Sequence, residues 1–237
     1  MEVMPDESAF GASYANGKPQ LVWTTLVADL ETPVSAYLKL ARERFPSFLL
    51  ESVEGGAVRG RYSIIGLDPD LIFRVRGDKA EINRSVSRDA NAFESVSQLP
   101  LEALRSLVAE SKVEVPFGLP PMAAGIFGYL GYDMVRQMEK LTASKPDPIG
   151  TPDAVLVRPA IVVVFVALKD SMTVVTPVRA QSGVNAKAAY ALAVERLTAV
   201  VEALDMPLNK ETTAASDEPI GANAVSNTAP AEYQAMV

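Results

Sequence analysis

Two kinds of hydrophobic pattern divide the chain, and the first is typical of β-strands. Residues 155–170 are Val-rich and nearly continuous in apolar character, and residues 171–179 form a second apolar run directly after them. A polar turn at Lys169, Asp170 and Ser171 separates the runs, which predicts a β-hairpin. Because the first run lacks a polar face, we expect it to be a central strand that is buried on both faces.

Shorter apolar runs earlier in the chain predict an antiparallel meander. Three such runs lie at residues 47–52, 61–67 and 70–77. The pair Gly77-Asp78 predicts a tight turn after the third run. Beyond the turn, Ala80 and Ile82 alternate with charged residues, which is typical of a strand with one solvent-exposed face. Residues 123–133 are rich in Gly and Tyr and predict a strand that leads into a turn.

The second pattern is the helical spacing of apolar residues. Thr32 is a good N-cap and Pro33 suits the first helical position, so we expect a helix that begins there and ends near residue 45. Residues 101–113 repeat the helical period, and residues 185–204 predict a long Ala-rich amphipathic helix. The combined pattern predicts the α+β class, with antiparallel β-sheets packed as a sandwich and flanking helices.

The composition changes after Leu204. Residues 205–227 are rich in Ala, Thr, Asn and Pro with few large apolar side chains, and they predict a linker. Residues 228–237 predict a helix start, in which Thr228 or Asn227 can cap the helix and Glu232 favours the helix dipole. The chain stops within about two helical turns of this start. This predicts a piece of a longer polypeptide, and a frayed natural tail is the alternative.

The net charge and two missing residue types exclude several functions. A net charge of −7 disfavours binding to nucleic acid or to anionic membranes. The chain has no cysteine, which excludes disulfides and thiolate metal sites. It also has no histidine, so Ser-His and Cys-His catalytic pairs cannot form. The acidic, polar N-terminus is unlike a signal peptide, and no apolar run is long enough to span a bilayer. We therefore expect a cytoplasmic protein.

Four sequence strings point to one known family. They are LLESVEGG at residues 49–56, GRYSIIGLDPDL at 60–71, PMAAGIFGYLGYDMV at 121–135 and PDAVLVRP at 152–159. In this order and at these spacings they resemble the N-terminal region of anthranilate synthase component I, the large subunit. The terminal string SNTAPAEYQAMV is similar to the entry into the chorismate-binding domain of that family.

The resemblance implies a domain organisation. Residues 1–31 form an N-terminal extension and residues 32–204 the regulatory domain of the family. Residues 205–227 are the linker, and residues 228–237 are the start of a truncated chorismate-binding domain.

The resemblance also implies a reaction and its partners. Members of the family convert chorismate and ammonia to anthranilate and pyruvate, with Mg²⁺ holding the substrate carboxylate. The ammonia comes from glutamine through a glutamine amidotransferase subunit, component II. The Mg²⁺ ligands and the catalytic histidine of the family belong to the C-terminal chorismate-binding domain. We therefore expect this chain alone to contain no catalytic residue and to be inactive.

The sharpest candidate site lies in the first string. In the family, this motif contributes to the feedback site for L-tryptophan. Glu51 is expected to pair with the ammonium of the ligand, Ser52 to bond a polar group, and Leu50 to line the indole pocket. From spacing alone, an acidic and a hydroxyl side chain at a strand end also fit a solvated terminus. The family's pocket takes a further segment from the C-terminal half, so we expect weak binding or none by this chain.

Other polar groups have simpler interpretations. Arg59, Arg61 and Tyr62 form either a small anion site or solvated charges at a strand edge, and Arg61 could brace Glu51 across adjacent strands. The glycine spacing of residues 125–131 differs from the dinucleotide fingerprint and favours close backbone packing.

Two alternatives to the family assignment remain. Component I of aminodeoxychorismate synthase shares the glycine-rich string, whereas LLES and RYSIIG favour anthranilate synthase. A free-standing amino-acid-binding or interaction module is the alternative from another class.

Overall fold

The computed structural model describes residues 1–42, 44–53, 59–142, 147, 149–208 and 228–236. The α+β class is confirmed: the described part of the chain forms an antiparallel sheet of eight strands with flanking helices. The strands are β1 (Gln20–Val27), β2 (Phe48–Val53), β3 (Arg59–Arg76), β4 (Lys79–Asn83), β5 (Glu94–Val96), β6 (Phe127–Leu130), β7 (Ala154–Val166) and β8 (Ser171–Val178). The helices are α1 (Glu7–Ala15), α2 (Pro33–Leu40), α3 (Pro100–Ser111), α4 (Ala186–Asp205) and α5 (Pro230–Met236), with 3₁₀ turns η1 (Tyr132–Gln137) and η2 (Ala167–Lys169).

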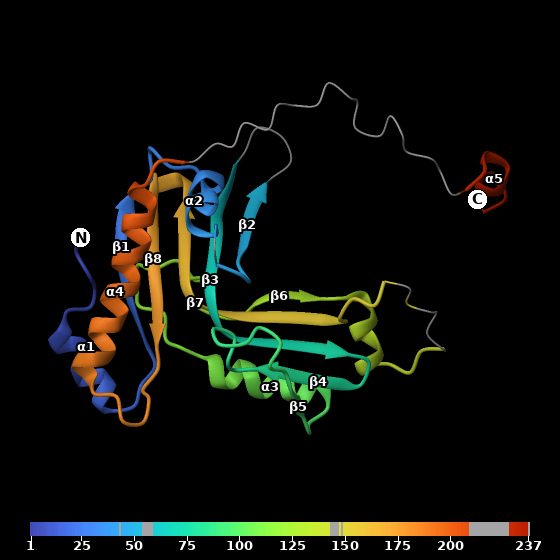
Figure 1. The fold of residues 1–237 in the computed structure, drawn as a ribbon, viewed down its shortest axis with the longest axis horizontal. Coiled ribbons are helices and arrows are strands. Elements are labelled where there is room, and N and C mark those ends of the chain that lie inside the picture. Colours follow the sequence, from blue (N-terminus) through green and yellow to red (C-terminus); the bar gives the residue numbers. More distant parts are fainter. Residues whose placement is uncertain (43, 54–58, 143–146, 148, 209–227, 237) are drawn as a thin grey trace.

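Two long strands run through the whole sheet. β3 pairs with β7 from Tyr62 opposite Val166 to Val75 opposite Ala154, and Figure 1 shows the sheet bending sharply midway along this pair. We call the two parts the first arm (β1, β8, β2 and residues 59–67 and 161–166) and the second arm (β4, β5, β6 and residues 71–76 and 154–158). The elbow comprises residues 68–70 and 159–160 between them. The antiparallel β-sheets expected from the sequence are thus arms of one hydrogen-bonded sheet in the described part of the chain.

Each arm has its own hydrophobic core beneath its own helices. In the first arm α1, α2 and α4 pack on the sheet, and the buried side chains include Phe10, Ile65 and Leu197. In the second arm α3 packs over a core that includes Phe73 and Leu107. A smaller cluster around Leu21, Ala123 and Val175 lies on the other side of the first arm.

Most of the predicted elements are present where the sequence placed them. The β7–β8 hairpin has Asp170 in the left-handed conformation at its turn, and residues 161–166 of β7 are all buried. The α2 helix begins at Pro33 after the N-cap Thr32, in a capping box in which Thr32 and Ser35 exchange side-chain-to-backbone hydrogen bonds. It ends at Leu40, earlier than the predicted end near residue 45. The two strands expected at residues 61–67 and 70–77 are one strand, β3, because an irregularity at the elbow bends the chain without ending the pairing.

The first 31 residues contain two elements that the sequence analysis did not predict. β1 pairs with β8 along its whole length, and α1 buries Phe10 and Tyr14 in the first-arm core. These residues therefore complete the first arm. The predicted linker falls largely at residues 209–227, outside the described residues, and the predicted helix start after it corresponds to α5.

Candidate functional site

The predicted ligand-binding residues lie on β2, which pairs only with β3 among the described strands. Phe48 pairs with Gly66, Leu50 with Ile64 and Glu51 with Ser63, and the register shifts after Glu51. β2 is therefore an edge strand of the first arm, and its outer edge is open to a further binding partner.

The pleat of β2 separates two of the three candidate side chains. Leu49 packs against the first-arm core, and Glu51 follows on the same face because side chains alternate along a strand. Leu50 lies on the opposite face and is 48% exposed. Glu51 and Ser52 are also exposed. A ligand that contacts both Leu50 and Glu51 has to reach around the strand edge.

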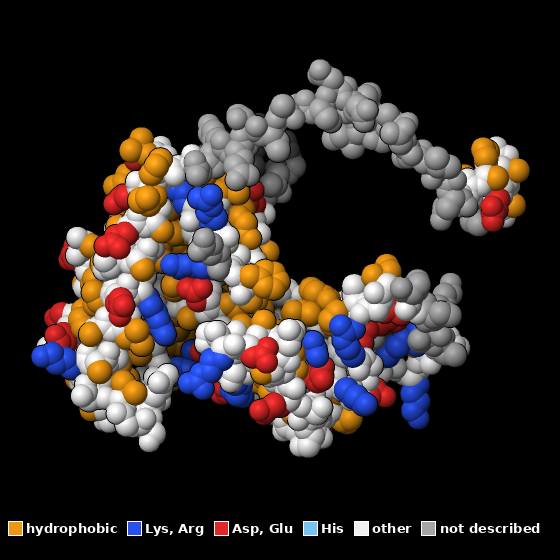
Figure 2. Space-filling view, viewed as in Figure 1, with side chains coloured by type: hydrophobic (Ala, Val, Ile, Leu, Met, Phe, Trp, Pro, Cys, Tyr) orange, Lys and Arg blue, Asp and Glu red, His pale blue; other side chains and the backbone are white. Residues whose placement is uncertain are grey.

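An aromatic contact joins the two arms near β2. The rings of Phe48 and Phe127 lie 5.1 Å apart, so β2 of the first arm touches β6 of the second arm. Gly66 makes room for this contact, because a Cβ atom there would lie 2.2 Å from the Phe48 ring. Figure 2 shows hydrophobic side chains gathered at the inside of the angle between the arms. Leu50 and Tyr129, which is 46% exposed, belong to the strands that border this angle.

Phe48, Gly66 and Phe127 were not among the residues that the sequence predicts for this region. The available signal was a glycine inside a strand pattern, which indicates close approach of another group. The aromatic contact joins residues that are far apart in the chain, so local patterns do not reveal it.

The arginine side chains near β2 make other contacts than those expected from the sequence. The guanidinium of Arg61 lies over the Tyr62 ring, 5.1 Å from its centroid, and among the described interactions it makes no ion pair with Glu51. The side chain of Arg59 lies outside the described residues.

The glycine-rich string confirms the close packing expected from its spacing. A Cβ atom at Gly128 would lie 2.0 Å from the carbonyl oxygen of Val155, and one at Gly131 would lie 2.9 Å from that of Asp153. β6 therefore approaches β7 more closely than a larger residue would allow.

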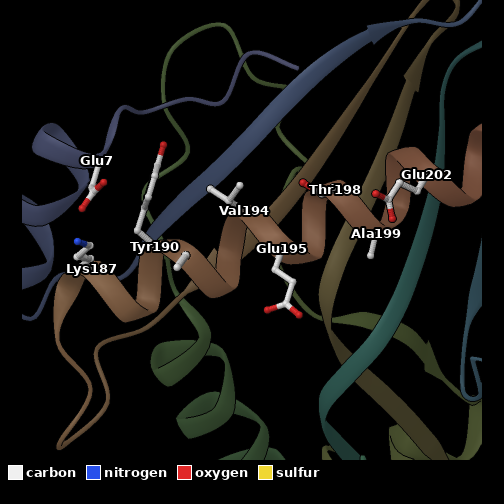
Figure 3. A pocket seen from close by; sticks show the side chains of 9 residues that line it. Glu7, Lys187, Tyr190, Val194, Glu195, Thr198, Ala199 and Glu202 are labelled. Carbon is white, nitrogen blue, oxygen red and sulfur yellow. The ribbon is translucent and has the colours of Figure 1, made fainter.

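A separate groove of about 640 Å³ runs along the outer side of α4, as Figure 3 shows. Its lining residues are Glu7, Lys187, Tyr190, Ala191, Val194, Glu195, Thr198, Ala199 and Glu202. The Tyr190 hydroxyl donates to the Pro5 carbonyl oxygen at 3.0 Å, and burial, with smaller effects of Asp6 and Glu7, raises the pKa of this phenol. None of Leu50, Glu51 and Ser52 lines this groove.

Two general features of the described residues bear on function. They contain no group of three or more acidic side chains placed to hold a metal ion. No helix among them has the length and apolar character needed to cross a membrane.

Comparison with known proteins identifies relatives of one kind. Anthranilate synthase component 1 of Cereibacter sphaeroides is 50% identical over 202 residues, which cover 85% of this chain and 40% of the relative. The protein of the same name from Thermus thermophilus is 43% identical over 65% of this chain and 31% of the relative. The Synechocystis protein of that name is 34% identical over 90% of this chain and 41% of the relative.

A solved structure of anthranilate synthase component I from Streptococcus pneumoniae aligns with a TM-score of 0.48 and 21% identity, over 77% of this chain and 36% of that chain. No family model matches the sequence.

These matches first indicate a class: each relative is component 1 of a synthase. More particularly, the chain is homologous to anthranilate synthase component I, and the resemblance drawn from the four sequence strings is confirmed. The chain spans about 40% of the length of the curated relatives that it matches over most of its own length.

Proposed function

We propose that this chain is the N-terminal, L-tryptophan-binding regulatory portion of anthranilate synthase component I. The observation that carries the proposal is the 50% identity over 85% of the chain to a protein of that name. The resemblance to the family motif LLES supports a regulatory role for Leu50, Glu51 and Ser52, three consecutive exposed residues of β2.

The complete protein, in this proposal, is a cytoplasmic lyase of tryptophan biosynthesis. It converts chorismate and ammonia to anthranilate and pyruvate, and a glutamine amidotransferase subunit supplies the ammonia from glutamine. Mg²⁺ serves the chorismate-binding domain, and its ligands lie outside this chain. The described residues contain no group of three or more acidic side chains that could hold the ion. The chain alone is inactive.

The chemistry of L-tryptophan suits the open edge of β2. The carboxylate of Glu51 can pair with the ligand ammonium, and the Ser52 hydroxyl can donate to or accept from its polar end. Leu50 offers apolar surface for the indole ring, and Phe48 lies two residues earlier on the same face of β2. Because Leu50 and Glu51 point to opposite faces, the ligand would lie around the edge, where a further segment could close the pocket.

Inhibition would follow from preferential binding to one state. Tryptophan that binds a low-activity arrangement more tightly shifts the population of the whole enzyme toward it. The ligand itself need not reach the reaction centre.

Substitution on β2 tests this proposal in the complete enzyme. We expect Ser52→Phe and Glu51→Ala to raise the tryptophan concentration needed for half-inhibition and to leave the uninhibited rate of anthranilate formation unchanged. The reason is that each change removes a ligand contact without touching the reaction centre. Glu139→Ala, which removes an exposed carboxylate beyond η1, serves as the control and should keep normal inhibition. Unchanged inhibition in both β2 variants would remove the feedback-site assignment.

The same assay separates the alternatives. Component I of aminodeoxychorismate synthase would form aminodeoxychorismate in place of anthranilate from the same substrates. A free-standing binding module would form neither product at any length of polypeptide. The three relatives are all named anthranilate synthase component 1, which favours the anthranilate synthase proposal over both alternatives.

A further inference from the structure

The elbow of the sheet is built around one extra residue in β3. Pro69 pairs with Pro159 and Leu71 pairs with Arg158, so Asp70 has no partner residue of its own on β7. Such a bulge bends a strand and increases its twist. Asp68, two residues earlier, has a φ of 48°, in the left-handed region that aspartate tolerates better than most residues.

The bulged Asp70 holds a buried arginine from the neighbouring strand. Arg158 Nε donates to Asp70 Oδ1 at 2.7 Å, and Arg158 Nη2 donates to Asp70 Oδ2 at 3.1 Å. The Arg158 side chain is only 8% exposed. A guanidinium at this depth is costly to leave without its carboxylate, so the bidentate pair favours the bent geometry.

Arg158 also reaches the end of α3 in the second arm. Its Nη1 donates to Glu110 Oε1 at 3.1 Å and to the Ser111 hydroxyl at 3.2 Å. Arg179, directly after β8 of the first arm, donates from Nη2 to the Ser111 carbonyl oxygen at 3.1 Å. Elements of both arms therefore meet at the last residues of α3.

Asp68 makes the corresponding contact on the other side of the elbow. Its Oδ2 atom lies 3.2 Å from Nη1 of Arg44, which belongs to the segment between α2 and β2 in the first arm. The contact is ionic, without hydrogen-bond geometry. Two aspartates separated by one proline are thus held by different arms of the molecule.

We propose that Asp68 and Asp70, with Arg44 and Arg158, form an elbow lock that fixes the angle between the two arms. The lock holds the bulge in one bent form, because straightening the strand would separate Arg158 from Asp70 and Asp68 from Arg44. The angle in turn determines whether Phe48 of the first arm meets Phe127 of the second. This role concerns the shape of the molecule and does not depend on tryptophan binding.

Distance measurement between spin labels tests the lock. The chain contains no cysteine, so Ala188→Cys on α4 and Arg105→Cys on α3 give one exposed labelling site in each arm. We expect a single narrow distance distribution by pulsed electron resonance. Asp70→Asn and Arg158→Met should broaden this distribution or shift its maximum. Asp133→Asn, which breaks an exposed ion pair with Arg136 in η1, should leave it unchanged.

The result depends on folded protein, which circular dichroism of each labelled variant verifies. If Arg158→Met does not fold, Asp70→Asn and Asp68→Asn decide, since both keep the size of the side chain at partly exposed positions. An unchanged distribution in the folded lock variants would overturn the proposal. A broadening that is equally large in Asp133→Asn would overturn it as well, because the effect would not be specific to the elbow.

Discussion

Gly128 illustrates a residue whose identity is dictated by its neighbours. Its φ is 151°, a conformation that L side chains rarely adopt, and an added Cβ atom would meet the rigid backbone of Val155. The spacing of the string already indicated close packing. Val155 lies 27 positions later in the chain, so the local sequence pattern could not identify it as the neighbour of Gly128.

The substitution Gly128→Ala should therefore destabilise the fold by about 1–3 kcal/mol, the usual effect of overpacking. Gly11 offers a matched control, because it lies inside α1 and an added Cβ would be 4.0 Å from the nearest atom, Ala186 Cβ. Gly11→Ala should be neutral or stabilise by up to about 1 kcal/mol through helix propensity. Urea unfolding of both variants measures the difference, and equal effects would contradict the packing argument.

The candidate site likewise combines residues that the local sequence predicts with a contact between residues that are distant in the chain. The string at residues 49–52 was sufficient to place a strand with polar residues at its end, and Leu50, Glu51 and Ser52 do lie there. The pleat that sends Leu50 and Glu51 to opposite faces follows from strand geometry. The aromatic contact between Phe48 and Phe127 depends on the bend of the sheet and was not predictable from either segment alone.

At the scale of elements, helix caps and turn residues made most helix and strand boundaries predictable from the sequence. Thr32 and Asn185 both cap their helices through side-chain oxygens that accept from the backbone, as their residue types favour. The missed helix, α1, buries only Phe10 and Tyr14 and has small or polar residues elsewhere, so its amphipathic pattern is weak. Its stability comes from packing on α4 and β1, which the local sequence does not show.

The connection of α3 to the sheet should depend on pH. The Arg84 side chain, through its hydrogen bonds, and to a smaller extent Arg158, lower the pKa of Glu110 from 4.5 to about 2. A carboxyl whose pKa is lower in the folded than in the unfolded chain stabilises the fold above the unfolded pKa. This contribution is therefore complete above pH 4.5 and is lost as the pH falls toward 2.

Glu110→Gln isolates this effect from the other carboxyl groups. We expect the free energy of unfolding of the unmodified protein to fall more steeply between pH 4.5 and 2 than that of the variant, because only the former loses the Glu110 charge. Denaturant unfolding at a series of pH values measures both slopes. Parallel slopes over this range would show that Glu110 gains no net stabilisation from its arginines.

At the scale of the whole molecule, the antiparallel class was predictable and the bend was not. Alternating and continuous apolar runs indicate strands, and short turns such as Gly77-Asp78 require antiparallel neighbours. The proposed elbow lock instead depends on pairs such as Asp70 and Arg158, which meet only after the chain has folded. The short-period spacing of apolar residues gives no information about contacts between residues that are far apart in the chain.

The arrangement of the arms gives the proposed function a physical basis. The candidate ligand residues occupy an open strand edge beside an angle lined with apolar side chains. Relatives that are 34–50% identical over most of this chain extend well beyond the part that it covers. A pocket completed at this edge by a further segment of the complete protein would connect ligand binding to the arrangement of the whole enzyme.

Calorimetric titration of the complete protein with L-tryptophan tests the central claim most directly. We predict that the unmodified protein and Glu139→Ala bind tryptophan equally, whereas Glu51→Ala binds it at least tenfold more weakly. A hydrogen bond to a charged group contributes about 1.5–3 kcal/mol, and about 1.4 kcal/mol corresponds to a factor of ten in affinity. Equal affinity in all three proteins would contradict the placement of the ammonium site on β2.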